Sequence, residues 1–468
     1  MKHLAQAPGE QLDGSGIPAH ERVDPFPRKV CIPFPLQRGS AGVRPEDAEE
    51  FAGGGGAGFG HGKLSVSYFV CGISYIGNHE EIETQGTKAS TYIRHTTYDI
   101  RTTNVLKDPR PRYAMEVITV NQLILLPCAA LAASVFLHAC ALKLFPELGL
   151  LDFPQRYGLW RKAIPYPTGL VAVVLFLLFF FAIQPLLADP WSTQHTGLVV
   201  STVLLALATL LDDRRQLSAK VRLQVQVLCA LIIFGTGTRI YSLTNPLEFL
   251  GFERIQLDTL VIPSPLLSDP SVVGALFTVL WLGLTINALN WFDGIPGQVS
   301  VLAVIGFLTI GGLSLSPRVG QPELALMSFL LAGIAAGGLL FDFPPAKVLM
   351  GDSGAMFYGL LLGVLTIYAG GKVATAFLVL GVPLIDFLIV IFRRIIKRTP
   401  VMRGGGKNEH LHHRLLSRGW SERQVILLTA VLGSVFGITA LFLTTVEKFL
   451  AALVLFLIMV GLSRYSRT

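Results

Sequence analysis

Four aspartates of the 468-residue chain are placed where they could take part in chemistry, because each lies beside an apolar stretch. A carboxylate next to a long hydrophobic segment is energetically costly and usually marks a functional site. Carboxylates without neighbouring cysteines suit a hard cation such as Mg2+, with Mn2+ as the alternative, bound together with the phosphate oxygens of a substrate. The residues that indicate this chemistry are Asp212, Asp213, Asp293 and Asp352.

Glycines accompany two of these aspartates and point to a phosphate ligand. Gly294 and Gly297 follow Asp293, while Gly351 and Gly354 surround the fourth aspartate, and glycines let a backbone come close to a ligand. Backbone N–H groups at the start of a following helix attract phosphate. Transfer of a phosphoryl group onto another anion needs a cation that neutralises the repulsion between them. The pattern therefore predicts a metal-dependent enzyme acting on phosphates.

Each motif also has a structural alternative. Paired aspartates before two arginines are typical of charges at a helix end. Asn287 and Asn290, three residues apart on one helix face, can join neighbouring helices by hydrogen bonds. Residues 351–354 fit a turn followed by a helix cap, and the histidines within 410–413 fit a solvated patch or an adventitious metal site. Their joint occurrence favours the functional interpretation.

The composition indicates an all-α polytopic membrane protein. Hydrophobic residues make up 51% of the chain and charged residues 15%, against about 25% charged in typical soluble domains. Apolar runs such as 169–187 and 272–289 have the length of roughly 17 to 25 residues that crosses a bilayer. This excludes a soluble enzyme, a disordered chain and a disulfide-stapled domain, and we expect no nucleic-acid partner.

We expect eleven membrane spans after Met115, with the N-terminus outside and the C-terminus cytoplasmic. The loop 393–423 carries nine Lys and Arg residues and must be cytoplasmic, which places 20 of the 25 basic residues of this part inside. The expected spans are 117–142, 168–188, 196–211, 221–239, 271–288, 298–315, 324–341, 354–370, 373–392, 424–444 and 449–463.

This topology gathers the polar segments on one side. All of them face the cytoplasm, although the spans were assigned from hydropathy and the orientation from charge. The sequence therefore predicts one composite site at the membrane boundary. The segments are 152–169, 212–224, 287–297, 346–354 and 410–414.

The first 114 residues differ from the rest of the chain. They contain 13 basic and 13 acidic residues, a glycine run at 53–56 and no segment long enough to span a membrane. Three interpretations stay open: a disordered tail, upstream sequence before a true initiator at Met115, or a small globular domain. We expect 1–114 to be dispensable and 115–468 to form the membrane enzyme.

Four motifs, in order, resemble those of the polyprenyl-phosphate N-acetylhexosamine-1-phosphate transferases, and the resemblance covers about 117 to 465. The HLHHR form is closer to the undecaprenyl-phosphate GlcNAc-1-phosphate transferase branch than to the phospho-MurNAc-pentapeptide transferases, which stay the alternative. The motifs are Leu211-Asp212-Asp213 with Leu217-Ser218-Ala219-Lys220, Asn287-x-x-Asn290-x-x-Asp293-Gly294, Ala346-Lys347-x-x-Met350-Gly351-Asp352-Ser353-Gly354 and His410-Leu411-His412-His413-Arg414, with Asp152, Pro154, Arg161-Lys162 and Pro165-x-Pro167 upstream.

The resemblance implies transfer of an N-acetylhexosamine-1-phosphate, most often GlcNAc-1-phosphate, from a UDP-sugar to undecaprenyl phosphate in the lipid bilayer, with release of UMP. It also implies the first membrane step of cell-envelope polysaccharide synthesis, on the cytoplasmic face of the inner membrane. A homodimer is left open.

Residue roles follow from the same resemblance. Asp352 would be the leading Mg2+ ligand, and Asp293 would lie beside the metal and the diphosphate. Asp212 and Asp213 would face the lipid phosphate, with Asp212 as the base or as a residue that orients the acceptor. Implied substrate contacts are Lys162, Arg222, Asn287, Asn290, Lys347, His410, His412, His413 and Arg414.

Departures from the family pattern concern specificity. Pro296 replaces a carboxylate of the usual DGxDG motif, Lys407 stands where an aspartate often precedes the histidines, and no histidine follows Lys162. Two other classes compete with the enzyme. A transporter should carry polar groups near the bilayer midplane, and an inactive scaffold has no need for all four aspartates.

The orientation is testable by labelling. A cysteine introduced at Gly405 should be shielded from an impermeant thiol reagent in intact cells and accessible in inverted vesicles, because the basic loop is cytoplasmic. The opposite labelling would overturn both the orientation and the cytoplasmic site.

Overall fold

The computed structural model describes residues 118–152, 162–187, 191–243, 245, 252, 254–262, 271–370, 372–400 and 409–466. All of them belong to one compact unit, 109–468. The expectations for residues 1–114 lie outside the described residues.

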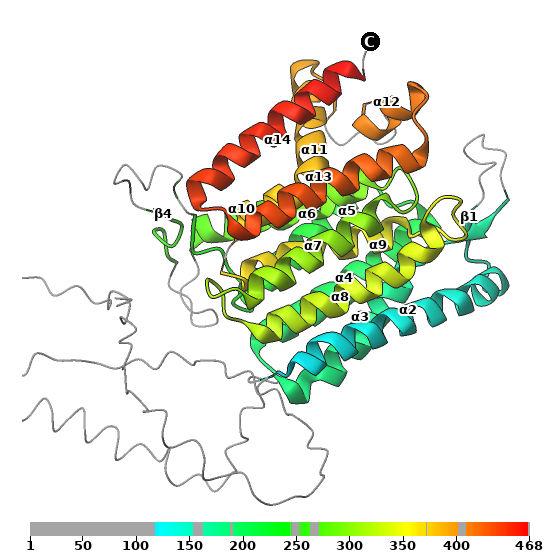
Figure 1. The fold of residues 1–468 in the computed structure, drawn as a ribbon, viewed down its shortest axis with the longest axis horizontal. Coiled ribbons are helices and arrows are strands. Elements are labelled where there is room, and N and C mark those ends of the chain that lie inside the picture. Colours follow the sequence, from blue (N-terminus) through cyan, green and yellow to red (C-terminus); the bar gives the residue numbers. More distant parts are fainter. Residues whose placement is uncertain are drawn as a thin grey trace, which may run out of the picture. The chain divides into compact units, whose positions relative to one another are not determined.

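The described chain is helical, as the sequence predicts (Figure 1). Its strands form only two antiparallel pairs of two residues each, β1 (Leu151–Asp152) with β2 (Ile164–Pro165) and β3 (Ser242–Leu243) with β4 (Ile255–Gln256). The helices are α2 (Val120–Glu147), α3 (Gly169–Ile183), η5 (Gln184–Leu186), α4 (Thr193–Arg215), α5 (Ala219–Gly235), α6 (Val272–Phe292), α7 (Gln298–Leu315), α8 (Pro322–Asp342), α9 (Gly351–Tyr368), α10 (Val373–Val379), α11 (Gly381–Ile396), α12 (Leu411–Ser417), α13 (Glu422–Phe442) and α14 (Thr445–Tyr465).

Each of the eleven expected spans corresponds to helical structure, but not every helix crosses a membrane by its length and composition. Within the described residues eight helical segments qualify, or nine if α10 and α11 together form one span. α5, with 17 residues, and α9, which begins in the polar Gly351–Gly354 segment, are not among them. The expected span 373–392 is a broken one, because α10 and α11 meet at 88°. The polytopic all-α class is confirmed.

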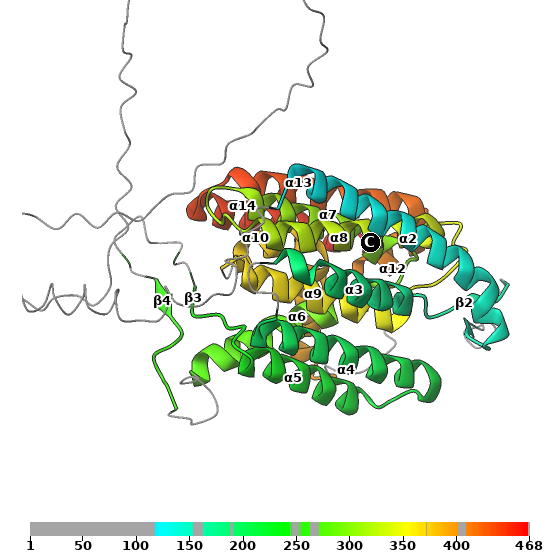
Figure 2. The same ribbon diagram turned by 90° about the horizontal axis from the view of Figure 1, so that it is seen from below.

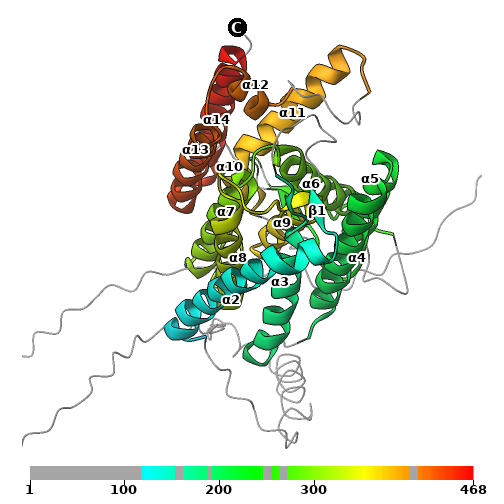
Figure 3. The ribbon, with the colours of Figure 1, turned by 90° about the vertical axis from the view of Figure 1, so that its right-hand side faces the viewer.

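α9 is the central helix of the bundle. Nearly all of its residues are buried, and it packs against α3, α4 and α6, which surround it in Figure 3. α2 lies along α8, and α8 along α7, while α4 and α5 run side by side (Figure 2). α2 and α14 bury only 17% and 11% of their most apolar windows, so their large apolar faces are left for lipid.

A close backbone approach joins the start of α3 to the start of α9. The N–H groups of Thr168 and Gly169 donate to the carbonyls of Leu349 and Met350, both at 2.9 Å. A Cβ on Gly169 would lie 2.1 Å from the backbone nitrogen of Gly354. Only glycine fits there, and this contact fixes where the polar beginning of α9 lies.

We expect Gly169→Ala to lower the melting temperature of the detergent-solubilised protein. The added methyl group meets backbone that cannot move aside, and overpacking of this kind costs about 1–3 kcal/mol. The matched control is Gly283→Ala in α6, where a Cβ would have no atom within 4 Å. An unchanged melting temperature for Gly169→Ala would contradict the close approach.

Candidate functional site

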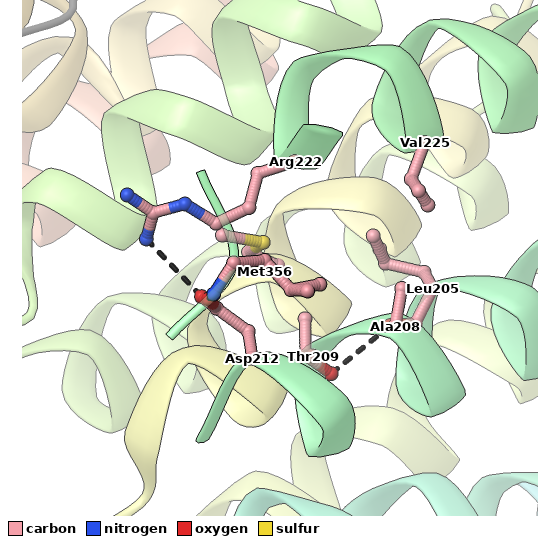
Figure 4. Close-up of a pocket in the computed structure, with 8 residues that line it drawn as sticks. Leu205, Ala208, Thr209, Asp212, Arg222, Val225 and Met356 are labelled. Atoms are coloured by element: carbon pink, nitrogen blue, oxygen red, sulfur yellow. Dashed lines mark hydrogen bonds and ion pairs between the residues drawn. The ribbon is translucent and has the colours of Figure 1, made fainter. Parts of the chain in front are cut away.

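One arginine joins two of the four aspartates. Asp212 lies in the last turn of α4, where its Oδ1 accepts a hydrogen bond from the Leu217 N–H at 2.6 Å. Arg222 reaches over from α5 and places Nη1 3.2 Å from Asp212 Oδ2 and 3.3 Å from Asp352 Oδ2 (Figure 4 shows the first pair). The left-handed conformation of Gln216, with φ of 50°, turns the chain back after α4 and makes this approach feasible. The ends of α4, α5 and α9 therefore meet at one point.

Asp213 has a partner that the sequence did not single out. The Tyr166 hydroxyl donates to Asp213 Oδ1 at 2.5 Å, whereas Asp213 Oδ2 is buried with no hydrogen-bond partner among the described residues. The ring of Tyr166 lies against Gly351, where a Cβ would be 2.6 Å away. Burial and then the charge of Asp213 raise the pKa of Tyr166 well above its usual range, so the phenol stays a donor. In the sequence, the only indication of a role for Tyr166 was its position between two prolines.

Asp293 lies in the turn between α6 and α7, among other carboxylates. Burial raises its pKa well above the usual range, and nearby negative charges raise it further. Those charges belong to Asp352, Asp342 and Asp213. Asp342, at the end of α8, is a second residue that the sequence analysis missed, and its carboxylate accepts a hydrogen bond from Ser300 Oγ at 2.6 Å. These carboxyl groups therefore resist being ionised together unless a cation compensates their charge.

The donor set fits Mg2+ better than a metal that the protein alone would enclose. Among the described residues no three His, Cys, Asp or Glu side chains converge on a single metal position. Mg2+ typically takes one or two carboxylates and completes its shell with water and phosphate oxygens. Asp352, with a third of its side chain exposed, is a suitable ligand, and so is Oδ2 of Asp213, which has no hydrogen-bond partner among the described residues.

The two asparagines of the predicted motif differ in position. Asn287 Nδ2 donates to Gln226 Oε1 of α5 at 2.6 Å, and to the Gly283 carbonyl at 2.8 Å, so its amide joins α5 to α6. Asn287 therefore joins neighbouring helices by hydrogen bonds, which was the structural alternative for this residue. Asn290 lies beside Asp352, and its side-chain amide interacts with that carboxylate. Of the pair, Asn290 is the one placed to meet a ligand.

The histidine segment packs on the end of α6. A Cβ on Gly294 would lie 2.1 Å from His412 Nε2, which explains the glycine after Asp293. The rings of His410 and His413 lie 5.7 Å and 4.2 Å from that of His412, between centroids. Both nitrogens of His412 are buried with no hydrogen-bond partner in the described residues. Burial, and then repulsion from His413 and His410 when these are protonated, lowers the pKa of His412 well below its usual range, so its ring is neutral.

Three basic residues implied as substrate contacts differ from one another in burial and in their contacts. Arg414 is buried and its Nη1 donates to the Ser463 carbonyl at 2.8 Å, which attaches α12 to α14. Lys347 is exposed, with Nζ 6.0 Å from the centroid of the Phe341 ring. Lys162 is exposed, and its neighbour Arg161 lies outside the described residues. The guanidinium of Arg414 is therefore engaged within the protein, and its implied contact with substrate stays a prediction.

Comparison with known proteins agrees with this arrangement. The family model described as glycosyl transferase family 4 matches residues 195–370, which run from α4 to the end of α9 and contain all four aspartates. The probable undecaprenyl-phosphate N-acetylglucosaminyl 1-phosphate transferase of Bacillus subtilis (strain 168) is 30% identical over 322 residues, which cover 67% of this chain and 83% of that protein.

The chain belongs to glycosyl transferase family 4. Another relative in the family is the undecaprenyl-phosphate alpha-N-acetylglucosaminyl 1-phosphate transferase of Escherichia coli (strain K12), 26% identical over 68% of this chain and 83% of the other. The phospho-N-acetylmuramoyl-pentapeptide-transferase of Moorella thermoacetica is 31% identical over a shorter region, 36% of this chain and 52% of that protein. The family resemblance predicted from the motifs is confirmed.

We expect Arg414→Met to destabilise the protein rather than to weaken ligand binding alone. Buried hydrogen bonds from a charged group contribute about 1.5–3 kcal/mol each, so the melting temperature should fall by roughly 5 °C. Arg215→Met, at an exposed position, is the matched control and should melt like the wild type. An unchanged melting temperature together with weaker UDP-sugar binding would instead indicate that Arg414 contacts the ligand.

Proposed function

We propose that the chain transfers an N-acetylhexosamine-1-phosphate, GlcNAc-1-phosphate foremost, from a UDP-sugar to undecaprenyl phosphate. An acceptor phosphate oxygen forms a bond to the phosphorus next to the sugar, and the bond to UMP breaks. The products are the lipid-diphosphate-linked sugar and UMP. The observation that carries the proposal is the bridge from Arg222 to Asp212 and Asp352, because it brings a cation suited to phosphate and a carboxylate suited to a metal within hydrogen-bond distance of each other.

A small hollow between α4 and α5 marks where the acceptor phosphate would lie. Its walls are mostly apolar, while Asp212 and Arg222 form its polar end (Figure 4). The planar fork of the Arg222 guanidinium matches two phosphate oxygens. The other lining residues are Leu205, Ala208, Thr209, Leu217, Val225 and Met356.

Mg2+, when bound by Asp352, would neutralise the charge that develops on the diphosphate. Asp212 acts on the acceptor through Arg222. Both of its oxygens are engaged, one by the Leu217 N–H and the other by Arg222. A phosphate monoester has a second pKa near about 6 and is mostly a dianion at neutral pH, so little deprotonation is needed. This favours the orienting role of Asp212 over that of a base.

The helix-end positions of the aspartates favour an enzyme over a transporter. Asp212 lies in the last turn of α4, Asp352 in the first turn of α9 and Asp293 directly after α6. A transporter site lies near the bilayer midplane. With the excess of basic residues on the same side, we place the site on the cytoplasmic face of the inner membrane, where a soluble UDP-sugar can reach it.

The direct test is transfer from labelled donors. Membranes containing the protein are incubated with undecaprenyl phosphate and either UDP-GlcNAc, other UDP-N-acetylhexosamines or UDP-MurNAc-pentapeptide. We expect labelled lipid and UMP from UDP-GlcNAc, dependent on Mg2+ and abolished by a chelator. Transfer from the pentapeptide donor alone would favour the phospho-MurNAc-pentapeptide alternative, and no transfer from any donor would favour a scaffold.

Asp352→Asn should lower turnover by about two orders of magnitude, because it removes a charge from the metal shell and keeps the shape of the side chain. The control is Asp258→Asn, the same exchange at an exposed aspartate outside the site. The measurement is the initial rate of labelled lipid formation at saturating Mg2+. Activity of Asp352→Asn within a few-fold of wild type would contradict the proposal that Asp352 binds the metal.

A further inference from the structure

The buried carboxylate of Asp386 on α11 is not among the residues that the proposed function uses. Asp386 is 2% exposed and lies on the short helix after the 88° break. Its Oδ1 accepts a hydrogen bond from the Leu411 N–H at 3.0 Å, and its Oδ2 lies 2.8 Å from His410 Nδ1. The two oxygens thus hold the start of the histidine segment at two points.

The contact with Asp386 determines which nitrogen of His410 carries the proton. A carboxylate only accepts hydrogen bonds, so Nδ1 must be protonated and must donate. Nε2, on the other side of the ring, is then the nitrogen left for another molecule. The partner of one ring nitrogen commonly sets the orientation and chemistry of the other.

Neighbouring side chains fix the plane of the His410 ring. It lies edge to face on Trp291 with 5.6 Å between centroids, and nearly parallel to His412 at an angle of 11°. Trp291 is itself held by Phe387, the residue after Asp386, at 4.7 Å, and by the Arg394 guanidinium at 5.1 Å. α11 therefore positions the histidine and the surface on which it rests.

We propose that Asp386 is a positioning residue that holds His410 so that Nε2 faces the sugar-diphosphate end of the donor. The inference rests on the proposed function. The donor end is indicated because the adjoining His412 rests on Gly294, next to Asp293, whereas Asp212 and Arg222 occupy the acceptor end.

An asparagine at position 386 separates positioning from folding. Its carbonyl oxygen can still accept from the Leu411 N–H, which keeps that attachment. Its NH2 group then faces His410 and can only donate, so Nδ1 must lose its proton and Nε2 must take it up. Asp386→Asn therefore reverses the tautomer with little change in shape.

The experiment measures steady-state transfer with donor and acceptor varied separately. We expect Asp386→Asn to lower kcat/KM for the UDP-sugar by about 10- to 100-fold, the usual effect of losing a partner that orients a functional histidine. The KM for undecaprenyl phosphate should stay within two-fold. Asp386→Asn with His410→Asn should be no worse than His410→Asn alone, since both changes remove the same interaction.

His410→Asn keeps the proposal testable if Asp386→Asn fails to fold. The shorter amide can still donate to Asp386 but has nothing in place of Nε2, so it should melt like the wild type and lose donor kcat/KM to a similar extent. Glu409→Gln is the control, because it removes the neighbouring ion pair with Arg394, 2.7 Å long, without touching the ring. It should keep wild-type kinetics.

Three results would overturn the inference. They are wild-type donor kinetics in Asp386→Asn or His410→Asn, losses that multiply in the double variant, and an equal rise in the KM of donor and acceptor. A wild-type protein that transfers no sugar phosphate would instead refute the proposed function, and the inference with it.

Discussion

The contact between the backbones at Gly169 and Gly354 determines where the rest of the site can lie. It brings the start of α3 to the start of α9, and with it the segment that carries Tyr166. Tyr166 then reaches Asp213 of α4, while Asp352 in the first turn of α9 faces Arg222 of α5. This contact leaves no room for a side chain on Gly169 or Gly354, and it fixes how the four helices lie relative to one another.

The electrostatics of the site follow from that crowding. Carboxylates that would repel one another are held close together by packing, and burial makes each charge more costly. Arg222 compensates two of them, and Tyr166 supplies a hydrogen bond to a third. Ionising the remaining carboxyl groups is unfavourable without further positive charge, which is the physical reason for the divalent cation in the proposed function.

Hydropathy could predict most helices because an apolar stretch of sufficient length has few alternatives in a membrane. The break between α10 and α11 could not be predicted, since the apolar character continues through it. Gly381 fits closely against Leu455 of α14, a contact between residues far apart in the sequence. Asp386 was missed for the same reason, because it lies inside what hydropathy assigns to a continuous span.

Motifs predicted the aspartates better than they predicted the roles of their neighbours. A carboxylate at a helix end is costly wherever it points, so its residue type alone carries information. The direction of a long side chain depends on what surrounds it. Arg414 follows the histidines in sequence but bonds to Ser463, and Tyr166 became visible only through its contact with Asp213.

The attachment of α12 to α14 has a consequence for biogenesis. Arg393 and Arg414 both donate to the Ser463 hydroxyl, so the histidine segment is held by a helix that follows all the other described helices in the chain. A nascent chain that has inserted α2 to α11 already holds its aspartates, and Asp386 can hold the start of this segment, but the bonds from Arg393 and Arg414 have no acceptor before α14. The attachment of α12 to α14 can therefore form only after α13 and α14 have been synthesised, which makes the final placement of the histidine segment a later step of assembly than the placement of the aspartates.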